Sequence, residues 1–537
     1  MNSRRRFLMA ATAVLASVSL LAACSAGSSD NDGDSNANDA TGGSFIYAGV
    51  PDTLIPGRVL GGFAQVIPLW ASLTWVEPDG SLTNLQADSI SSEDRTLWTI
   101  KLKDGWKFHN GEPVTAKSFV DAWNYVAYAP NAYENSGELS NIVGYEDLNP
   151  VEGKPATKEM DGLKVIDDLT FTVQLKSADS QFPSQLSQMQ TGFYPMPESA
   201  YVDMKAYGDE PIGNGPYQMA APTRPGKEYT VKRYEDYMGP KGKADTITFK
   251  PYTDNATTYT DVLAGQADIT YIAPAKFVAA KGDFGDRVWA NDAPSIDYLG
   301  FPLWDSRYSD KRVREAISMS IDRDAVNNAI FGGLYDPATA FTPPAEAGTP
   351  EGLLDDEVRY DPTEARKLLA EAGGFTGTVT FVYPGGYDVD DLYQAYANQV
   401  RQNLGVEAVA TPTTGWSDFY SAVEGRTVAG PHFGTWGALY SSQQNTLRQL
   451  YTKAGSGNVF TGYYTNPAVD SALASAEQAS TEDEVHTAYE QAQEVLKADL
   501  PVIPTFFSKY VYVTSPKITK MVASLGVPIL AQLSVNQ

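Results

Sequence analysis

Cysteine and histidine are nearly absent from this chain of 537 residues, which contains one cysteine and three histidines. A single cysteine cannot form an intrachain disulfide, nor can it build a cysteine-ligated zinc or iron–sulfur site. The three histidines, His109, His432 and His486, are scattered along the sequence, which argues against a histidine-rich metal site. We therefore expect neither a bound metal nor another cofactor.

Basic residues are also few, because 40 Lys and Arg stand against 66 Asp and Glu and give a formal net charge of −26. A negative field of this size repels polyanions, so we expect no nucleic-acid partner. The sequence contains no nucleophile-elbow, zincin, P-loop or dinucleotide-binding motif. We expect no catalytic residues and no enzyme activity, although a pair of carboxylates acting as a glycosidase stays open.

The first 23 residues are typical of an export signal. Arg4, Arg5 and Arg6 precede an uncharged, largely apolar stretch over residues 7–23, which is short for a membrane-spanning helix. The sequence Leu-Ala-Ala-Cys that ends at Cys24 resembles a bacterial lipobox, so Cys24 is the predicted lipidation site. Residues 3–8 also resemble the twin-arginine export motif, and both the Sec and the twin-arginine routes stay open. Cleavage before Cys24 removes three arginines and no acid, which changes the net charge to −29.

Residues 25–43 contain only Ser, Ala, Gly, Asp, Asn and Thr, which cannot build a core. We interpret 24–43 as a lipidated cysteine followed by a flexible tether. Strand and helix patterns then alternate, which predicts an α/β fold. Strands are predicted over 44–48, 96–102, 502–507 and 510–513, and helices after the capping residues Thr115, Asp310 and Asp361.

Six segments resemble, in order, the extracytoplasmic solute-binding proteins of the peptide, nickel and oligosaccharide ABC importers. They are Pro78-Asp79-Gly80 with 98–123, 213–217, 263–269, 312–326, 360–373 and 466–470. The resemblance implies a type II periplasmic-binding-protein-like fold, in which a hinge joins two lobes and one lobe carries an inserted third domain. It places lobe I at 44–72, 196–290 and 501–537, the inserted domain at 73–195, and lobe II at 291–500.

The resemblance also implies where a solute binds. Residues 433–440 match the segment along which relatives hold an extended peptide, and Trp416 matches another cleft aromatic. The expected ligand-binding residues are Trp416, Trp436, Gly437, Ala438, Leu439, Tyr440, Phe506 and Phe507. Peptide-binding relatives carry an aspartate that pairs with the peptide's ammonium where this chain has Leu439. Either another acid, with Asp418 as a candidate, replaces it, or the ligand has no amine there.

The implied function is that of a lipid-anchored receptor on the outer face of the bacterial cell membrane. It captures oligopeptides between its lobes and delivers them to a permease driven by a separate ATPase, as a monomer. An oligosaccharide or another small solute stays open as the ligand, because aromatic side chains also stack on sugars. A surface lipoprotein with a sensor or adhesin role is the third alternative.

Overall fold

The computed structural model describes residues 41–536. The predicted signal peptide, Cys24 and nearly all of the predicted tether lie outside these residues. Within 41–536, no helix is both long enough and apolar enough to cross a bilayer.

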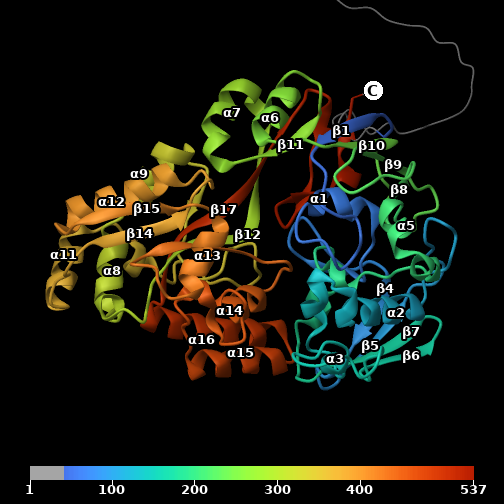
Figure 1. Ribbon diagram of the computed structural model, residues 1–537, viewed down its shortest axis with the longest axis horizontal. Coiled ribbons are helices and arrows are strands. Elements are labelled where there is room, and N and C mark those ends of the chain that lie inside the picture. The colour runs from blue at the N-terminus through green and yellow to red at the C-terminus, as the bar shows by residue number, and fades with distance from the viewer. Residues whose placement is uncertain (1–40, 537) are drawn as a thin grey trace, which may run out of the picture.

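The largest sheet of the described chain has eleven strands, and two long strands occupy its middle (Figure 1). In spatial order the path runs β15 (Ala408–Thr413), β14 (Val379–Pro384), β16 (His432–Gly437), β12 (Val288–Gly300), β17 (Val502–Thr514), β11 (Ile269–Ile272), β1 (Ser44–Ala48), β10 (Thr246–Lys250), β9 (Tyr229–Arg233) and β8 (Tyr217–Met219), while β13 (Asp336–Pro337) pairs with β17. We call β14, β15 and β16 with their helices the β14 half, and β1 and β8–β11 with theirs the β1 half.

A second, four-stranded sheet lies between β1 and β8 in the sequence, and its strand order is β4-β5-β7-β6. The strands are β4 (Ala87–Ser91), β5 (Leu97–Leu102), β6 (Leu163–Asp167) and β7 (Thr170–Gln174), and every pair is antiparallel. Helix α2 (Ala116–Ala127) packs on this sheet, and the hairpin of β2 (Thr74–Val76) and β3 (Leu82–Asn84) precedes it. We call residues 73–195, which contain these elements, the inserted unit.

The predicted capping residues begin their helices as expected. Thr115 forms a capping box with Ser118 at the start of α2. The Asp310 side chain accepts a hydrogen bond from the backbone of α8 (Lys311–Met319), and Asp361 does the same for α11 (Pro362–Glu371). Each side chain satisfies backbone N–H groups that a helix N-terminus leaves free, which is why these positions could be predicted from sequence.

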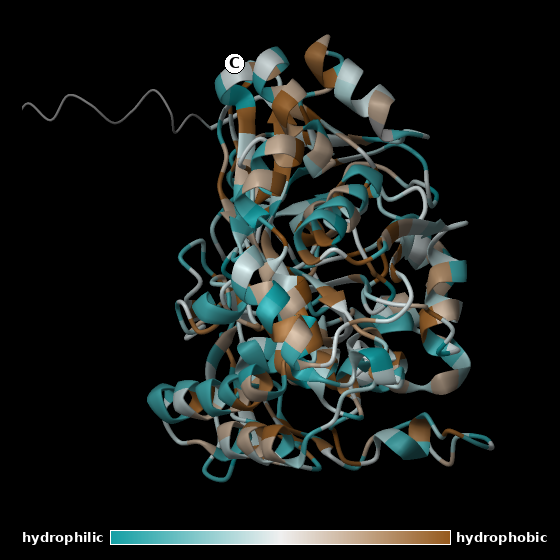
Figure 2. Cartoon of the chain, turned by 90° about the vertical axis from the view of Figure 1, so that its left-hand side faces the viewer, coloured by the Kyte–Doolittle hydropathy of each residue, from teal (hydrophilic) through white to brown (hydrophobic). Residues whose placement is uncertain are grey.

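Helices cover both faces of the β14 half. One core contains residues of α8, α11, α12 (Asp390–Leu404) and β14, and another contains residues of α14 (Gln443–Tyr451), α15 (Pro467–Gln478) and α16 (Glu482–Asp499). Helix α16 buries Val485, Ala488, Tyr489, Ala492 and Leu496, a spacing that gives one apolar face. Figure 2 shows the resulting mixture of apolar and polar residues along the helices. On the β1 half lie α6 (Asn255–Leu263) and α7 (Phe277–Phe284).

Candidate functional site

Strands β12 and β17 connect the two halves of the sheet. They pair antiparallel from Val288 with Val513 to Gly300 with Val502, with two breaks in register, between Asp292 and Ile296 and between Asp297 and Tyr298. Instead of the two predicted strands over 502–507 and 510–513, the chain forms the single strand β17. Ser508 and Lys509, which lie between the two predicted strands, bond to β12: Ser508 donates to Asp297, and the Lys509 ammonium lies 2.6 Å from Asp292 Oδ1.

Strand β16 offers an unpaired backbone edge beside this connection. It pairs with β12 from His432 to Gly437, but in the described chain it pairs with β14 only at His432. The Ala438 N–H donates to Pro294 O at 2.7 Å, which sets the alternation of the ladder. The N–H and C=O groups of Thr435 and Gly437 therefore point away from β12, and both residues are exposed. This edge can pair with an extended chain whatever side chains that chain carries.

A cavity of about 530 Å³, the Trp436 cavity, lies at the C-terminal end of β16. Trp436, Gly437, Leu439 and Tyr440 line it from the β14 half, and Glu138, Asp179, Gln190 and Phe193 line it from the inserted unit. The Trp436 indole N–H donates to Asn445 Oδ1 at 2.9 Å, and the Tyr440 hydroxyl donates to Gln444 Oε1 at 3.0 Å. Side chains in the first turn of α14 therefore hold both rings in place.

The acids of the Trp436 cavity are held by neutral donors. Burial raises the pKa of Glu138 to about 8, although the Gly192 N–H donates to this carboxylate. Burial also raises the pKa of Asp179, which accepts hydrogen bonds from the side chains of Gln444 and Gln185. The bond from Gln444 to Asp179 joins the β14 half to the inserted unit, whereas the Gln185 and Gly192 donors belong to the inserted unit itself.

A smaller cavity of about 170 Å³, the Asp297 cavity, lies at the other end of the exposed β16 edge. Residues 273–275 of the β1 half form one wall, and Phe433 and Gly434 of β16 belong to the opposite wall. Seven aromatic residues line the space, namely Tyr298, Phe331, Tyr335, Tyr387, Tyr393, Tyr396 and Phe433. Burial raises the pKa of Asp297, while hydrogen bonds from Thr435 and Ser508 oppose this shift.

The structure gathers only some of the predicted ligand-binding residues. Four of them, Trp436, Gly437, Leu439 and Tyr440, line the Trp436 cavity. Ala438 is buried, and its backbone N–H donates to Pro294 O of β12. Trp416 begins α13 (Trp416–Glu424) and stacks on Tyr387, with ring centroids 5.5 Å apart. It lines neither cavity, but its partner Tyr387 lines the Asp297 cavity.

The two predicted phenylalanines point in different directions. Phe506 is 1% exposed and packs against Tyr335, which itself lines the Asp297 cavity. Phe507 lines a third cavity, of about 740 Å³, together with Asp292 and Asp336. Asp418, the candidate replacement for the missing acid at Leu439, is exposed in the first turn of α13 and lines neither the Trp436 nor the Asp297 cavity.

Asp297 lines the Asp297 cavity but was not among the predicted ligand-binding residues. A signal was present, because an aspartate interrupts the otherwise apolar run from Ile296 to Phe301. An acid at such a position needs a structural or functional partner to offset its desolvation.

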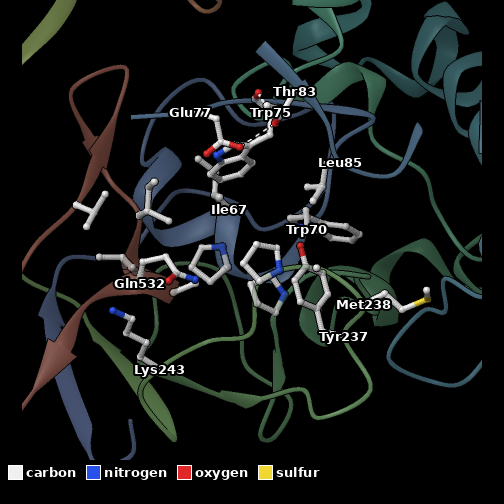
Figure 3. Close-up of a pocket in the computed structure, with 18 of the residues that line it drawn as sticks. Ile67, Trp70, Trp75, Glu77, Thr83, Leu85, Tyr237, Met238, Lys243 and Gln532 are labelled. Atoms are coloured by element: carbon white, nitrogen blue, oxygen red, sulfur yellow. Dashed lines mark hydrogen bonds between the residues drawn. The ribbon is translucent and has the colours of Figure 1, made fainter. Parts of the chain in front are cut away.

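Another cavity, of about 790 Å³, lies elsewhere (Figure 3). Trp70, Trp75 and Tyr237 line it, together with Lys243 and Gln532. Its walls come from the β1 half, the inserted unit and the C-terminal segment, and none of its residues lies in 291–500. It contains none of the predicted ligand-binding residues.

Known proteins resemble this chain in sequence and fold. Residues 81–458 match the family described as bacterial extracellular solute-binding proteins, family 5. The glutathione-binding protein GsiB of Pectobacterium atrosepticum is 28% identical over 82% of this chain and 84% of its own length. The periplasmic murein peptide-binding protein MppA of Escherichia coli is 26% identical over 85% of this chain and 86% of its own length.

Two solved structures have a similar fold. The unliganded open form of MppA superimposes with a TM-score of 0.78 at 22% identity and covers 93% of this chain and 99% of its own. The ABC transporter substrate-binding protein CtaP of Listeria monocytogenes has a TM-score of 0.77 at 20% identity and covers 93% of this chain and all of its own. These likenesses confirm the predicted α/β fold of the type II periplasmic-binding-protein kind. The chain therefore belongs to the bacterial extracellular solute-binding proteins, family 5.

Proposed function

We propose that this protein is the peptide-capturing component of an ABC importer. The observation that carries the proposal is the exposed edge of β16, where the backbone groups of Thr435 and Gly437 lack a strand partner in the described chain. Two cavities flank this edge, one at each end. From Gly434 to Leu439 an extended chain advances roughly 3.3 Å per residue, so the edge accommodates a peptide of a few residues.

Main-chain pairing supplies affinity without selecting side chains, and the cavities supply preferences at particular positions. The relatives include proteins named for binding glutathione, murein peptide and oligopeptides, which supports a peptide as the solute.

Release of the solute requires that the two sides of the cleft separate. We propose that β12 and β17 act as the hinge between lobe I (44–72, 196–290, 501–537) and lobe II (291–500), and that the inserted domain (73–195) moves with lobe I. Ligand contacts made by both lobes favour the closed state, and a permease with a separate ATPase receives that state. Export, cleavage before Cys24 and lipidation of Cys24 keep the protein at the outer face of the cell membrane.

The test compares alanine tetrapeptides with depsipeptides in which one amide N–H is replaced by an ester oxygen. Titration calorimetry on protein that has been unfolded, washed and refolded measures binding without a carried-over ligand. Loss of one hydrogen bond to the β16 edge should weaken binding about three- to tenfold, since such a bond contributes roughly 0.5 to 1.5 kcal/mol. Equal affinity of every depsipeptide, or binding of maltotriose in place of the peptides, would overturn the proposal.

A further inference from the structure

The carboxyl group of Asp297 has no cationic partner in the described chain. Among residues 41–536 it takes part in no ion pair, whereas nearby Asp292 and Asp336 both lie within 3 Å of the Lys509 ammonium. An ionised carboxylate offers about four acceptor positions. Ser508 Oγ occupies one, at 3.0 Å from Asp297 Oδ2, and Thr435 occupies another. Acceptor capacity is left over on this carboxyl group, and Asp297 lines the cavity.

The surroundings of this carboxylate suit an organic cation. The aromatic rings of Tyr335, Tyr387, Tyr393 and Phe433 line the same space, and the negative faces of such rings attract ammonium groups. Asp388, which is exposed, adds a second acid to the lining. A metal ion fits less well, because calcium and magnesium need at least six oxygen ligands, and no cluster of three or more His, Cys, Asp or Glu side chains suited to a metal occurs in the described chain.

The size of the cavity points to one group of a larger ligand. Its volume of about 170 Å³ is below the roughly 300 to 1,000 Å³ that encloses a whole small molecule. Phe433 and Gly434 connect it directly to the exposed part of β16, so a ligand lying along that edge can place one end in it.

We propose that the Asp297 cavity is a specificity subsite that takes a primary ammonium group of the bound solute. This inference rests on the proposed peptide-binding function and specifies the ligand further. Asp297 of β12 pairs with Thr435 of β16. Leu439 lies four residues beyond Thr435, which is roughly 13 Å along an extended chain. The ammonium therefore lies at the opposite end of β16 from Leu439. Its source is either a lysine side chain or the amino terminus of the peptide.

The experiment uses matched tetrapeptides in competition, read by native mass spectrometry on the mature protein. N-acetylated alanine tetrapeptides carry lysine or its uncharged analogue norleucine at each position in turn. Tetra-alanine with and without the acetyl group tests the amino terminus separately. The variants are Asp297→Asn and, as the matched control, Asp336→Asn, whose acid is already paired with Lys509 and lines a different cavity.

We expect the wild-type protein to retain at least one ammonium-bearing probe about tenfold or more over its uncharged twin, because a desolvated charge pair is strongly coupled. In Asp297→Asn that ratio should fall to about threefold or less, while binding of the uncharged twins persists. Asp336→Asn should keep the wild-type ratio. Thermal unfolding establishes that each variant is folded.

Two results would overturn the subsite and leave peptide binding intact: no preference for ammonium in the wild type, or the same preference in Asp297→Asn. The first of these results needs only the wild-type protein, so the subsite can be refuted even if Asp297→Asn fails to fold. If no tetrapeptide binds at all, the proposed function fails, and the inference fails with it.

Discussion

Gln444 on α14 donates a hydrogen bond from Nε2 to Oδ1 of Asp179 over 2.9 Å, and this bond joins the β14 half to the inserted unit. Neighbouring backbone contacts reinforce the contact: the Ser180 N–H donates to Glu477 O at 2.8 Å, and the Ser180 hydroxyl donates to Ala476 O at 2.8 Å. The inserted unit therefore contacts the β14 half directly, outside the β12–β17 connection.

Gln444→Ala should destabilise the protein by about 1 to 3 kcal/mol, because it removes one donor from the buried Asp179 carboxylate. Denaturant unfolding measures the change. Gln449→Ala is the control on the same helix, since the hydrogen bonds described for the Gln449 side chain go to the nearby Ser456. Equal effects of the two substitutions would mean that the contact between the two parts contributes no stability of its own.

Trp436→Ala should weaken peptide binding about tenfold or more, because the indole lines the cavity at the end of the β16 edge and large aromatic anchors dominate such sites. Titration calorimetry measures the affinity. Trp304→Ala is the control, since Trp304 packs at a tilt against Tyr463 and lines neither the Trp436 nor the Asp297 cavity. Wild-type affinity in Trp436→Ala would remove this residue from the binding site.

Local patterns predicted the helix starts at Thr115, Asp310 and Asp361, since a capping bond involves residues only two or three positions apart. The cleft could not be predicted in the same way. Phe506 and Phe507 are adjacent in sequence and were both expected to face the ligand. Successive residues of a strand point to opposite faces, so one packs in a core while the other lines a different cavity.

Asp297 was missed for a related reason. Its environment is made by residues 273–275 before it in the chain and by Tyr387 and Phe433 far beyond it. No spacing rule connects these segments, because the crossing of β12 between the two halves brings them together. The family resemblance supplied the segment 433–440, but it directed attention to Leu439, where an acid is missing, and away from the acid that is present.

His109 should make stability depend on pH below neutrality. The Gly213 N–H donates to His109 Nδ1 at 3.2 Å, so the ring carries its proton on Nε2, which lies 3.1 Å from Gly215 O. Burial lowers the pKa of His109 from 6.5 to about 4. The unfolded chain therefore binds this proton at a higher pH than the folded chain, and the folded state loses stability as pH falls from about 7 towards 4.

The contribution of His109 is measured as a difference, because Glu138, whose pKa is raised, has the opposite effect in part of the same range. From pH 7.5 to pH 5, wild type should lose about 2 kcal/mol more unfolding free energy than His109→Gln. His486→Gln, which replaces a partly exposed histidine on α16, is the control. Parallel stability curves for wild type and His109→Gln would contradict the neutral, buried histidine.

Cys24→Ser should release the protein from the cell membrane, since it removes the thiol to which the proposed lipid is attached. Cell fractionation with immunoblotting measures the membrane-bound share, and mass spectrometry of the N-terminal peptide detects the acyl groups. Ser25→Ala, which retains the thiol, is the control. An unchanged membrane fraction in Cys24→Ser would show that something other than this cysteine holds the protein there.

Thr435→Pro tests the exposed backbone edge from the protein's side. Thr435 faces Asp297 in a pair without mutual backbone hydrogen bonds, so its N–H points away from β12 and proline removes no bond of the ladder. Peptide affinity should fall about threefold to tenfold with the loss of this donor. Thr435→Val is the matched control, because it keeps the N–H and removes the hydroxyl that bonds to Asp297. If Thr435→Val loses as much affinity as Thr435→Pro, the hydroxyl, and not the strand edge, holds the ligand. If Thr435→Pro binds as wild type while remaining folded, the peptide does not pair with β16 at this residue.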